Sequence, residues 1–71
     1  MVRPQTYRVV SRFLAARGWR RIRTRGSHEI WESPDGRAKV TVVAHEGIVS
    51  AGVVRQIQAH FPDDTEAAGW R

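Results

Sequence analysis

The shortness of the chain, together with its lack of cysteine, limits its possible folds more than any single motif does. Its 71 residues make one domain, and a domain of this size buries only about 60% of the surface that its unfolded chain exposes. It has no cysteine to form a stabilising disulfide, so one apolar core must hold it together. Such a chain has little room for a deep substrate pocket, which excludes a Rossmann or barrel enzyme. A polymer that lies across an open surface is the substrate class that fits better.

Nothing in the sequence directs the chain to a membrane or out of the cell. No segment approaches the roughly 20 apolar residues that cross a bilayer, and residues 1–10 lack the apolar region of a signal peptide. Small secreted domains usually contain disulfides, so a cysteine-free domain is typical of a reducing compartment. We therefore expect a cytoplasmic protein without a membrane contact.

The positive charge is concentrated at the start of the chain. The formal net charge is +5, and no acidic residue precedes Glu29. Arginine binds phosphate through two parallel hydrogen bonds and stacks on bases, so this distribution favours a polyanion such as a nucleic acid. The alternative is a solvated surface in which arginine replaces lysine through codon bias. Eight of the 12 basic residues lie within the first 25 positions: Arg3, Arg8, Arg12, Arg17, Arg20, Arg21, Arg23 and Arg25.

Helical periodicity appears twice, near the two ends of the chain. Apolar residues recur at helical spacing after Thr6, a plausible N-cap, and Gly18 is a plausible terminator, which predicts a helix over residues 6–17. Ser50 can cap a second helix, and Pro62 ends it.

Between these helices the composition favours β-strands. Residues 19–25, 28–32 and 39–43 are rich in β-formers, and a Pro-Asp-Gly turn at 34–36 separates the last two. The element order is therefore αβββα. We predict an α+β fold in which two helices pack on one face of a three-stranded antiparallel sheet and leave the other face open.

The last ten residues differ from the rest because they carry three acids and one arginine. We assign residues 1–61 to a single domain and residues 62–71 to an acidic C-terminal tail. The tail is either frayed or forms a short extra turn that docks through Trp70.

The three histidines are the residues best suited to chemistry. Their spacing does not match a metal site, and nothing marks a Ser/His/Asp triad. One histidine can nevertheless act on RNA, because imidazole exchanges a proton near neutral pH and the substrate supplies its own 2′-hydroxyl nucleophile. Arginines can stabilise the charge that develops on the phosphate. From the residues alone, composition and spacing favour His28 as a hydrogen-bonded surface residue of a strand over a catalytic residue. His45 is a second candidate with a structural or substrate-binding role.

Three segments in order carry a family resemblance: Gly18-Trp19, then Arg25-Gly26-Ser27-His28-Glu29-Ile30-Trp31, then Ser33-Pro34-Asp35-Gly36-Arg37. A V-x-V strand with His45 and a Gly-x-x-Arg-x-Ile helix follow, so the match covers roughly residues 6–58. This pattern resembles the HicA (YcfA-like) mRNA interferase toxins of HicAB toxin–antitoxin pairs. The chain departs from the family at Glu29, where a second histidine is usual, and at Ala44, where proline is usual.

The resemblance implies a double-stranded-RNA-binding-domain-like fold and a type II toxin that cleaves mRNA without a metal or other cofactor and so blocks translation. It implies that His28, in the Gly-Ser-His segment, is the catalytic residue. It also implies a HicB-type antitoxin that covers the active site, with DNA contacted only indirectly through the toxin–antitoxin complex.

The RNA-binding residues that we expect lie around His28. They are Arg21, Arg23, Arg25, Ser27, Trp31, Arg37 and Lys39.

The role of Trp31 depends on which face of its strand points outward. It could stack on RNA on the open face, contact the antitoxin, or be a half-buried surface residue. His28 and Ile30 share the other face because side chains alternate along a strand. If Ile30 packs in the core, His28 should point inward too, unless a bulge or a twisted strand start near Gly26 turns it toward solvent.

Two other functions remain open from the sequence. The chain could be a non-catalytic RNA-binding module that uses the same basic face, or a degenerate toxin that only binds its antitoxin.

Overall fold

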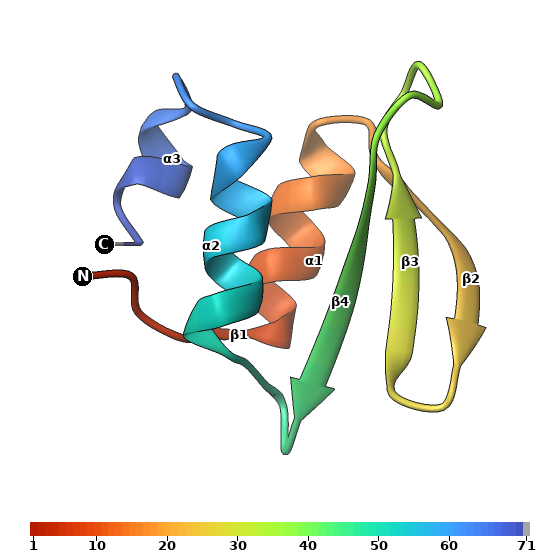
Figure 1. Cartoon of the computed structure of the whole chain (residues 1–71), viewed down its shortest axis with the longest axis horizontal. Helices are drawn as coiled ribbons and strands as arrows, with labels where there is room; N and C mark the ends of the chain where they lie inside the picture. Colours follow the sequence, from red (N-terminus) through yellow and green to blue (C-terminus); the bar gives the residue numbers. More distant parts are fainter. Residues whose placement is uncertain (71) are drawn as a thin grey trace.

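The computed structural model describes residues 1–70, and its first helix, α1, spans Tyr7–Ala16 (Figure 1). The Thr6 hydroxyl accepts a hydrogen bond from a backbone amide of the first turn at 3.2 Å, which is an N-cap. At the other end Gly18 adopts a φ of +81°, and the Trp19 amide donates to a carbonyl of the last turn at 3.0 Å. The helix predicted over residues 6–17 is confirmed, with a cap residue at each end.

The sheet has five antiparallel strands rather than the three that the sequence predicted. Strands β2 (Arg20–Arg25), β3 (His28–Glu32) and β4 (Lys39–His45) are the predicted meander. Strands β1 (Gln5–Thr6) and β5 (Ile48–Val49) extend it beyond β4, so the order is β1-β5-β4-β3-β2. Two residues are too few to show the alternation that identifies a strand in a sequence, and the prediction therefore lacked these two strands.

A tight hairpin joins β4 to β5. Its two central residues, Glu46 and Gly47, have φ values of +53° and +79°, as a type I′ turn requires. The Gly47 carbonyl accepts a hydrogen bond from the Tyr7 amide at 2.9 Å. The hairpin is thereby fixed to the start of α1.

The helices lie together on one side of β4, and the β2–β3 hairpin extends on the other (Figure 1). Helix α2 (Ala51–Ala59) begins at Ser50, whose hydroxyl accepts the Val53 amide at 3.4 Å. None of the helices within residues 1–70 is long and apolar enough to cross a membrane. A single core joins helices and sheet, and its most deeply buried members are Val10, Phe13, Leu14, Val42, Val49, Val54 and Ile57.

The C-terminal segment packs against this core. It forms the short helix α3 (Thr65–Ala68), and Trp70 after it is only 5% exposed. The Trp70 ring lies 4.7 Å from the ring of Phe13, and its carbonyl accepts the Arg3 amide at 2.8 Å. The two ends of the described chain therefore lie close together (Figure 1). Of the two possibilities for this segment, the docked turn is the one that the structure has.

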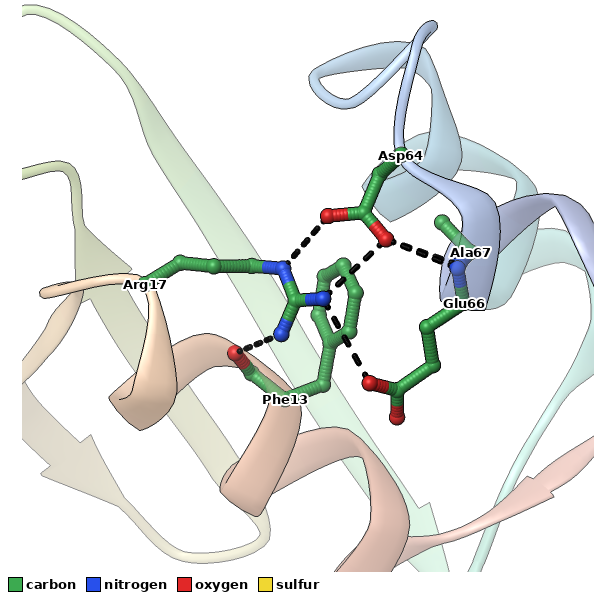
Figure 2. Close-up of polar contacts among 5 residues, drawn as sticks. All are labelled: Phe13, Arg17, Asp64, Glu66 and Ala67. Atoms are coloured by element: carbon green, nitrogen blue, oxygen red, sulfur yellow. Dashed lines mark hydrogen bonds and ion pairs between the residues drawn. The ribbon is translucent and has the colours of Figure 1, made fainter.

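One arginine holds α3 against α1. Arg17 contacts Asp64 through two hydrogen bonds of 2.6 and 3.0 Å, and its guanidinium carbon lies 3.5 Å from the centre of the Phe13 ring (Figure 2). Asp64 also caps α3 by accepting the amides of Glu66 and Ala67. The hydrogen bond from Arg17 lowers the pKa of Asp64 below its ordinary value. The two helices are thus joined by a contact that needs an ionised carboxylate.

We expect this contact to make the fold sensitive to acid. The pKa of Asp64 is lower in the folded chain, so the contact stabilises the fold above the unfolded pKa of about 3.9 and disappears as the pH falls through the lower folded value. Asp64→Asn should therefore lower the urea midpoint at pH 6 and reduce its further fall toward pH 2.5, as followed by tryptophan fluorescence. Asp63→Asn, at the exposed neighbouring position, is the matched control and should behave as wild type. Identical pH profiles for the two variants would contradict the assignment.

Candidate functional site

Strand β3 presents its residues to two different environments. Trp31 is 7% exposed and belongs to the core, whereas His28 is exposed. Side chains alternate along a strand, so Glu29 lies on the helix side with Trp31, and Ile30 lies on the opposite side with His28. We call this opposite side of the sheet the outer face. His28 reaches it without any distortion of β3, because Trp31 rather than Ile30 packs in the core.

This arrangement corrects the expectation for Trp31. A base-stacking platform must be exposed, and Trp31 is buried. Its indole nitrogen donates to Glu29 at 3.1 Å on the helix side of the sheet. The larger aromatic surface has more to gain from burial than Ile30 has, and the glutamate satisfies its one polar atom.

A bulge in β2 divides the arginines between the two sides of the sheet. Arg21 pairs with Trp31, but the next paired residue, Arg23, is opposite Ile30, so Ile22 is an extra residue in the strand. Cross-strand partners share a face, which places Arg21 on the helix side and Arg23 on the outer face. Without the bulge, the alternation would have put both on one side. A bulge or twisted strand start near Gly26 was expected only if Ile30 packed in the core, and the irregularity that the structure has lies at Ile22 of β2.

The outer face has a hollow beside His28. Its volume is about 270 Å³, and Arg23, Arg25, His28, Ile30 and Thr41 line it. His28 pairs directly with Arg25 on β2 and with Val43 on β4. The hollow therefore combines two permanent cations, an exposed imidazole and an apolar floor, in a site that is open to a large ligand.

The other predicted cations lie away from this hollow. Arg37 is exposed in the turn after β3, and Lys39 pairs with Glu32 at the far end of β4. Val43, the partner of His28, is four positions along β4 from Lys39, a distance of about 13 Å. The turn that carries Arg37 is held by Asp35, whose pKa is lowered by a hydrogen bond from the Ser33 hydroxyl.

A second hollow lies near the β2–β3 turn on the helix side. Its volume is about 280 Å³, and Ser27 is among its lining residues, with Tyr7, Gly26, Glu29, Ala44 and Gly47. The expected RNA-binding residue Ser27 is thus adjacent to His28 in sequence but lines a different hollow.

Glu29 is the residue that sequence reasoning did not assign a role. Its carboxylate accepts the Tyr7 hydroxyl at 2.7 and 2.9 Å and the Arg21 guanidinium at 3.3 Å, in addition to the Trp31 indole. Burial, reinforced by the bond to Glu29, raises the pKa of Tyr7 above its ordinary value. The sequence did contain a signal for this role. Glu29 is two residues before Trp31 and so shares its side of the strand, and a half-buried carboxylate there needs hydrogen-bond donors. Glu29 joins α1, β2 and β3 and holds Arg21 away from the outer face.

None of the side chains in residues 1–70 gather into a group of three or more histidines and acids that could hold a metal ion. The protein groups of the hollow can transfer a proton through His28 and neutralise anionic oxygens through Arg23 and Arg25.

A family model described as the HicA toxin of bacterial toxin–antitoxin systems matches residues 7–70, which is nearly the whole chain. Searches among curated proteins and among solved structures give no match.

We expect the outer face, and not the total charge, to determine polyanion binding. The double substitution Arg23→Gln/Arg25→Gln removes two cations from the hollow, and Arg8→Gln/Arg12→Gln removes the same charge from the exposed side of α1. The probe is a labelled 2′-O-methyl RNA strand, which lacks the 2′-hydroxyl, and binding is followed by anisotropy over a range of salt concentrations. For the outer-face variant, the slope of the logarithm of the binding constant against the logarithm of salt concentration should become shallower by about 0.7 for each phosphate that is no longer neutralised. The α1 variant should keep the wild-type slope. Equal effects of the two variants would contradict the site.

Proposed function

The chain belongs to the HicA toxin family of bacterial toxin–antitoxin systems, and on this premise we propose that it is a metal-independent endoribonuclease that cleaves mRNA and blocks translation. The observation that carries the proposal is the exposed imidazole of His28 at the hollow lined by Arg23 and Arg25. The resemblance of the Gly-Ser-His segment to the family's catalytic segment points to the same residue.

The reaction requires little from the protein because RNA carries its own nucleophile. In the proposed step, His28 accepts the proton of a 2′-hydroxyl, and the resulting oxyanion attacks the adjacent phosphorus. Arg23 and Arg25 stabilise the negative charge that grows on the non-bridging oxygens. These three side chains line one hollow, and an open hollow accepts a strand of RNA that would not enter a deep pocket.

We also propose that the substrate is recognised through the outer face of a domain related to double-stranded-RNA-binding domains. In this interpretation α1, β2, β3, β4 and α2 correspond to the αβββα order, and β1, β5 and α3 are additions. Arg37 and Lys39 would contact more distant parts of the RNA, because they lie outside the hollow. Ser27, in the β2–β3 turn next to His28, would contact the RNA only at the edge of the outer face.

The family is one of toxin–antitoxin pairs, and its members therefore imply an antitoxin partner. We propose a HicB-type antitoxin that covers the outer face and so withholds His28 from RNA. DNA would be contacted only through the antitoxin in the complex, and the pair would act in the cytoplasm.

The alternative functions use the same face without chemistry. A non-catalytic RNA-binding module, or a degenerate toxin that only binds its antitoxin, would need Arg23 and Arg25 but would not need His28. Removal of the imidazole therefore separates catalysis from binding.

We expect His28→Ala to abolish toxicity and to slow RNA cleavage by about 10²–10⁴-fold, the usual contribution of a general acid or base. The measurements are growth after induction in cells and cleavage of RNA by purified protein in the presence of EDTA. His60→Ala is the matched control, because it also removes one imidazole but does so away from the outer face. His60 lies at the end of α2, with its ring 5.5 Å from that of Trp19. Equal toxicity and equal RNA loss in His28→Ala and wild type would reject the catalytic role. Loss of wild-type cleavage in EDTA would reject the metal-free mechanism.

A further inference from the structure

We propose that His45 is a second catalytic residue, the general acid that protonates the leaving oxygen in the RNA cleavage for which His28 is the base. This inference rests on the proposed ribonuclease function and adds to it a residue for the second proton transfer.

The register of the sheet places His45 on the outer face. Ala44 pairs with Val49, which is fully buried, so this pair lies on the helix side. The next pair, His45 and Ile48, therefore lies on the opposite side, and both of its members are exposed.

His45 is also a neighbour of His28 on that face. His28 is directly opposite Val43, and His45 is two residues further along β4, which makes the two histidines diagonal neighbours. Residues of such a pair lie about 7–8 Å apart, and their β-carbons are somewhat closer. Ring nitrogens that each act over about 2.6–3.2 Å can then contact the two sides of one phosphodiester placed between them.

The backbone holds His45 in place. The hairpin that follows it is a two-residue turn with positive φ at Glu46 and Gly47, and the Gly47 carbonyl is bonded to the amide of Tyr7. The position of His45 relative to β3 is therefore set by β-sheet pairing on one side and by the start of α1 on the other. Arg25 pairs with His28 across the strands, and Arg23 lines the same hollow.

The chemistry of the cleavage needs two proton transfers at different oxygens. His28 takes the proton from the 2′-hydroxyl as the bond between the 2′-oxygen and phosphorus forms. The bond between phosphorus and the 5′-oxygen breaks, and that oxygen takes a proton from the His45 imidazolium. The products are a 2′,3′-cyclic phosphate and a 5′-hydroxyl. His28 has gained one proton and His45 has given one up, so that no oxidant, metal or other reactant is required.

The experiment compares two leaving groups in a purified system. One substrate is an RNA oligonucleotide with a natural 5′-oxygen, and the other has a bridging sulfur at that position, which leaves without protonation. His45→Ala should cleave the natural substrate about 10²-fold or more slowly than wild type and the sulfur substrate at close to the wild-type rate. His60→Ala, the matched control, should cleave both at the wild-type rate, and His28→Ala should be slow on both.

Each other outcome contradicts the assignment. Wild-type rates of His45→Ala on the natural substrate would exclude the residue from the reaction. Equal slowing of His45→Ala on both substrates would show a structural or binding role. If the sulfur substrate restored the rate of His28→Ala instead of that of His45→Ala, the roles of acid and base would be reversed. Absence of cleavage by wild type would reject the ribonuclease function itself, and this inference with it.

Discussion

The burial of Trp31 is the interaction on which the arrangement of this small protein depends. An aromatic side chain of this size contributes on the order of 4 kcal/mol when it leaves water, and its indole nitrogen is satisfied by Glu29. A strand with one such residue has only one favourable register, since a shift by one residue would exchange its two faces. His28 is exposed on the outer face because Trp31, three positions later, is held in the core.

The bulge at Ile22 divides the basic segment of the chain between the two sides of the sheet. This extra residue separates Arg21, bound to Glu29 on the helix side, from Arg23 and Arg25 in the hollow with His28. Arg23 and Arg25 remain available to one phosphate. Arg21 instead donates to the Glu29 carboxylate, which also accepts the Trp31 indole. The same strand thereby serves both stability and the proposed chemistry.

Interactions between sequence neighbours made part of the fold predictable from the sequence. For the candidate site, the sequence indicated a histidine and arginines but not the side of the sheet on which each of them lies. Thr6 and Gly18 indicated the two ends of α1 to within a residue. A capping hydroxyl and a residue with positive φ end a helix through contacts with their own sequence neighbours, so their effect can be inferred from the sequence. Strand β5 was not predictable in this way, since a Glu-Gly turn is a weaker hairpin signal than Asn-Gly or Asp-Gly and the strand has two residues. Ile30 and Trp31 are adjacent and both apolar, so their spacing did not indicate which one packs in the core. That choice depends on the helices that cover the sheet, which lie elsewhere in the sequence.

The ends of the RNA products test the proposed chemistry at the phosphate most directly. Purified wild-type protein in EDTA is incubated with an RNA strand and with the same strand made 2′-deoxy throughout, and the new ends are identified by mass spectrometry. We predict 2′,3′-cyclic phosphate and 5′-hydroxyl ends from the RNA and no cleavage of the deoxy strand. New 3′-hydroxyl and 5′-phosphate ends, or cleavage of the deoxy strand, would contradict a mechanism in which the substrate supplies the nucleophile and His28 activates it.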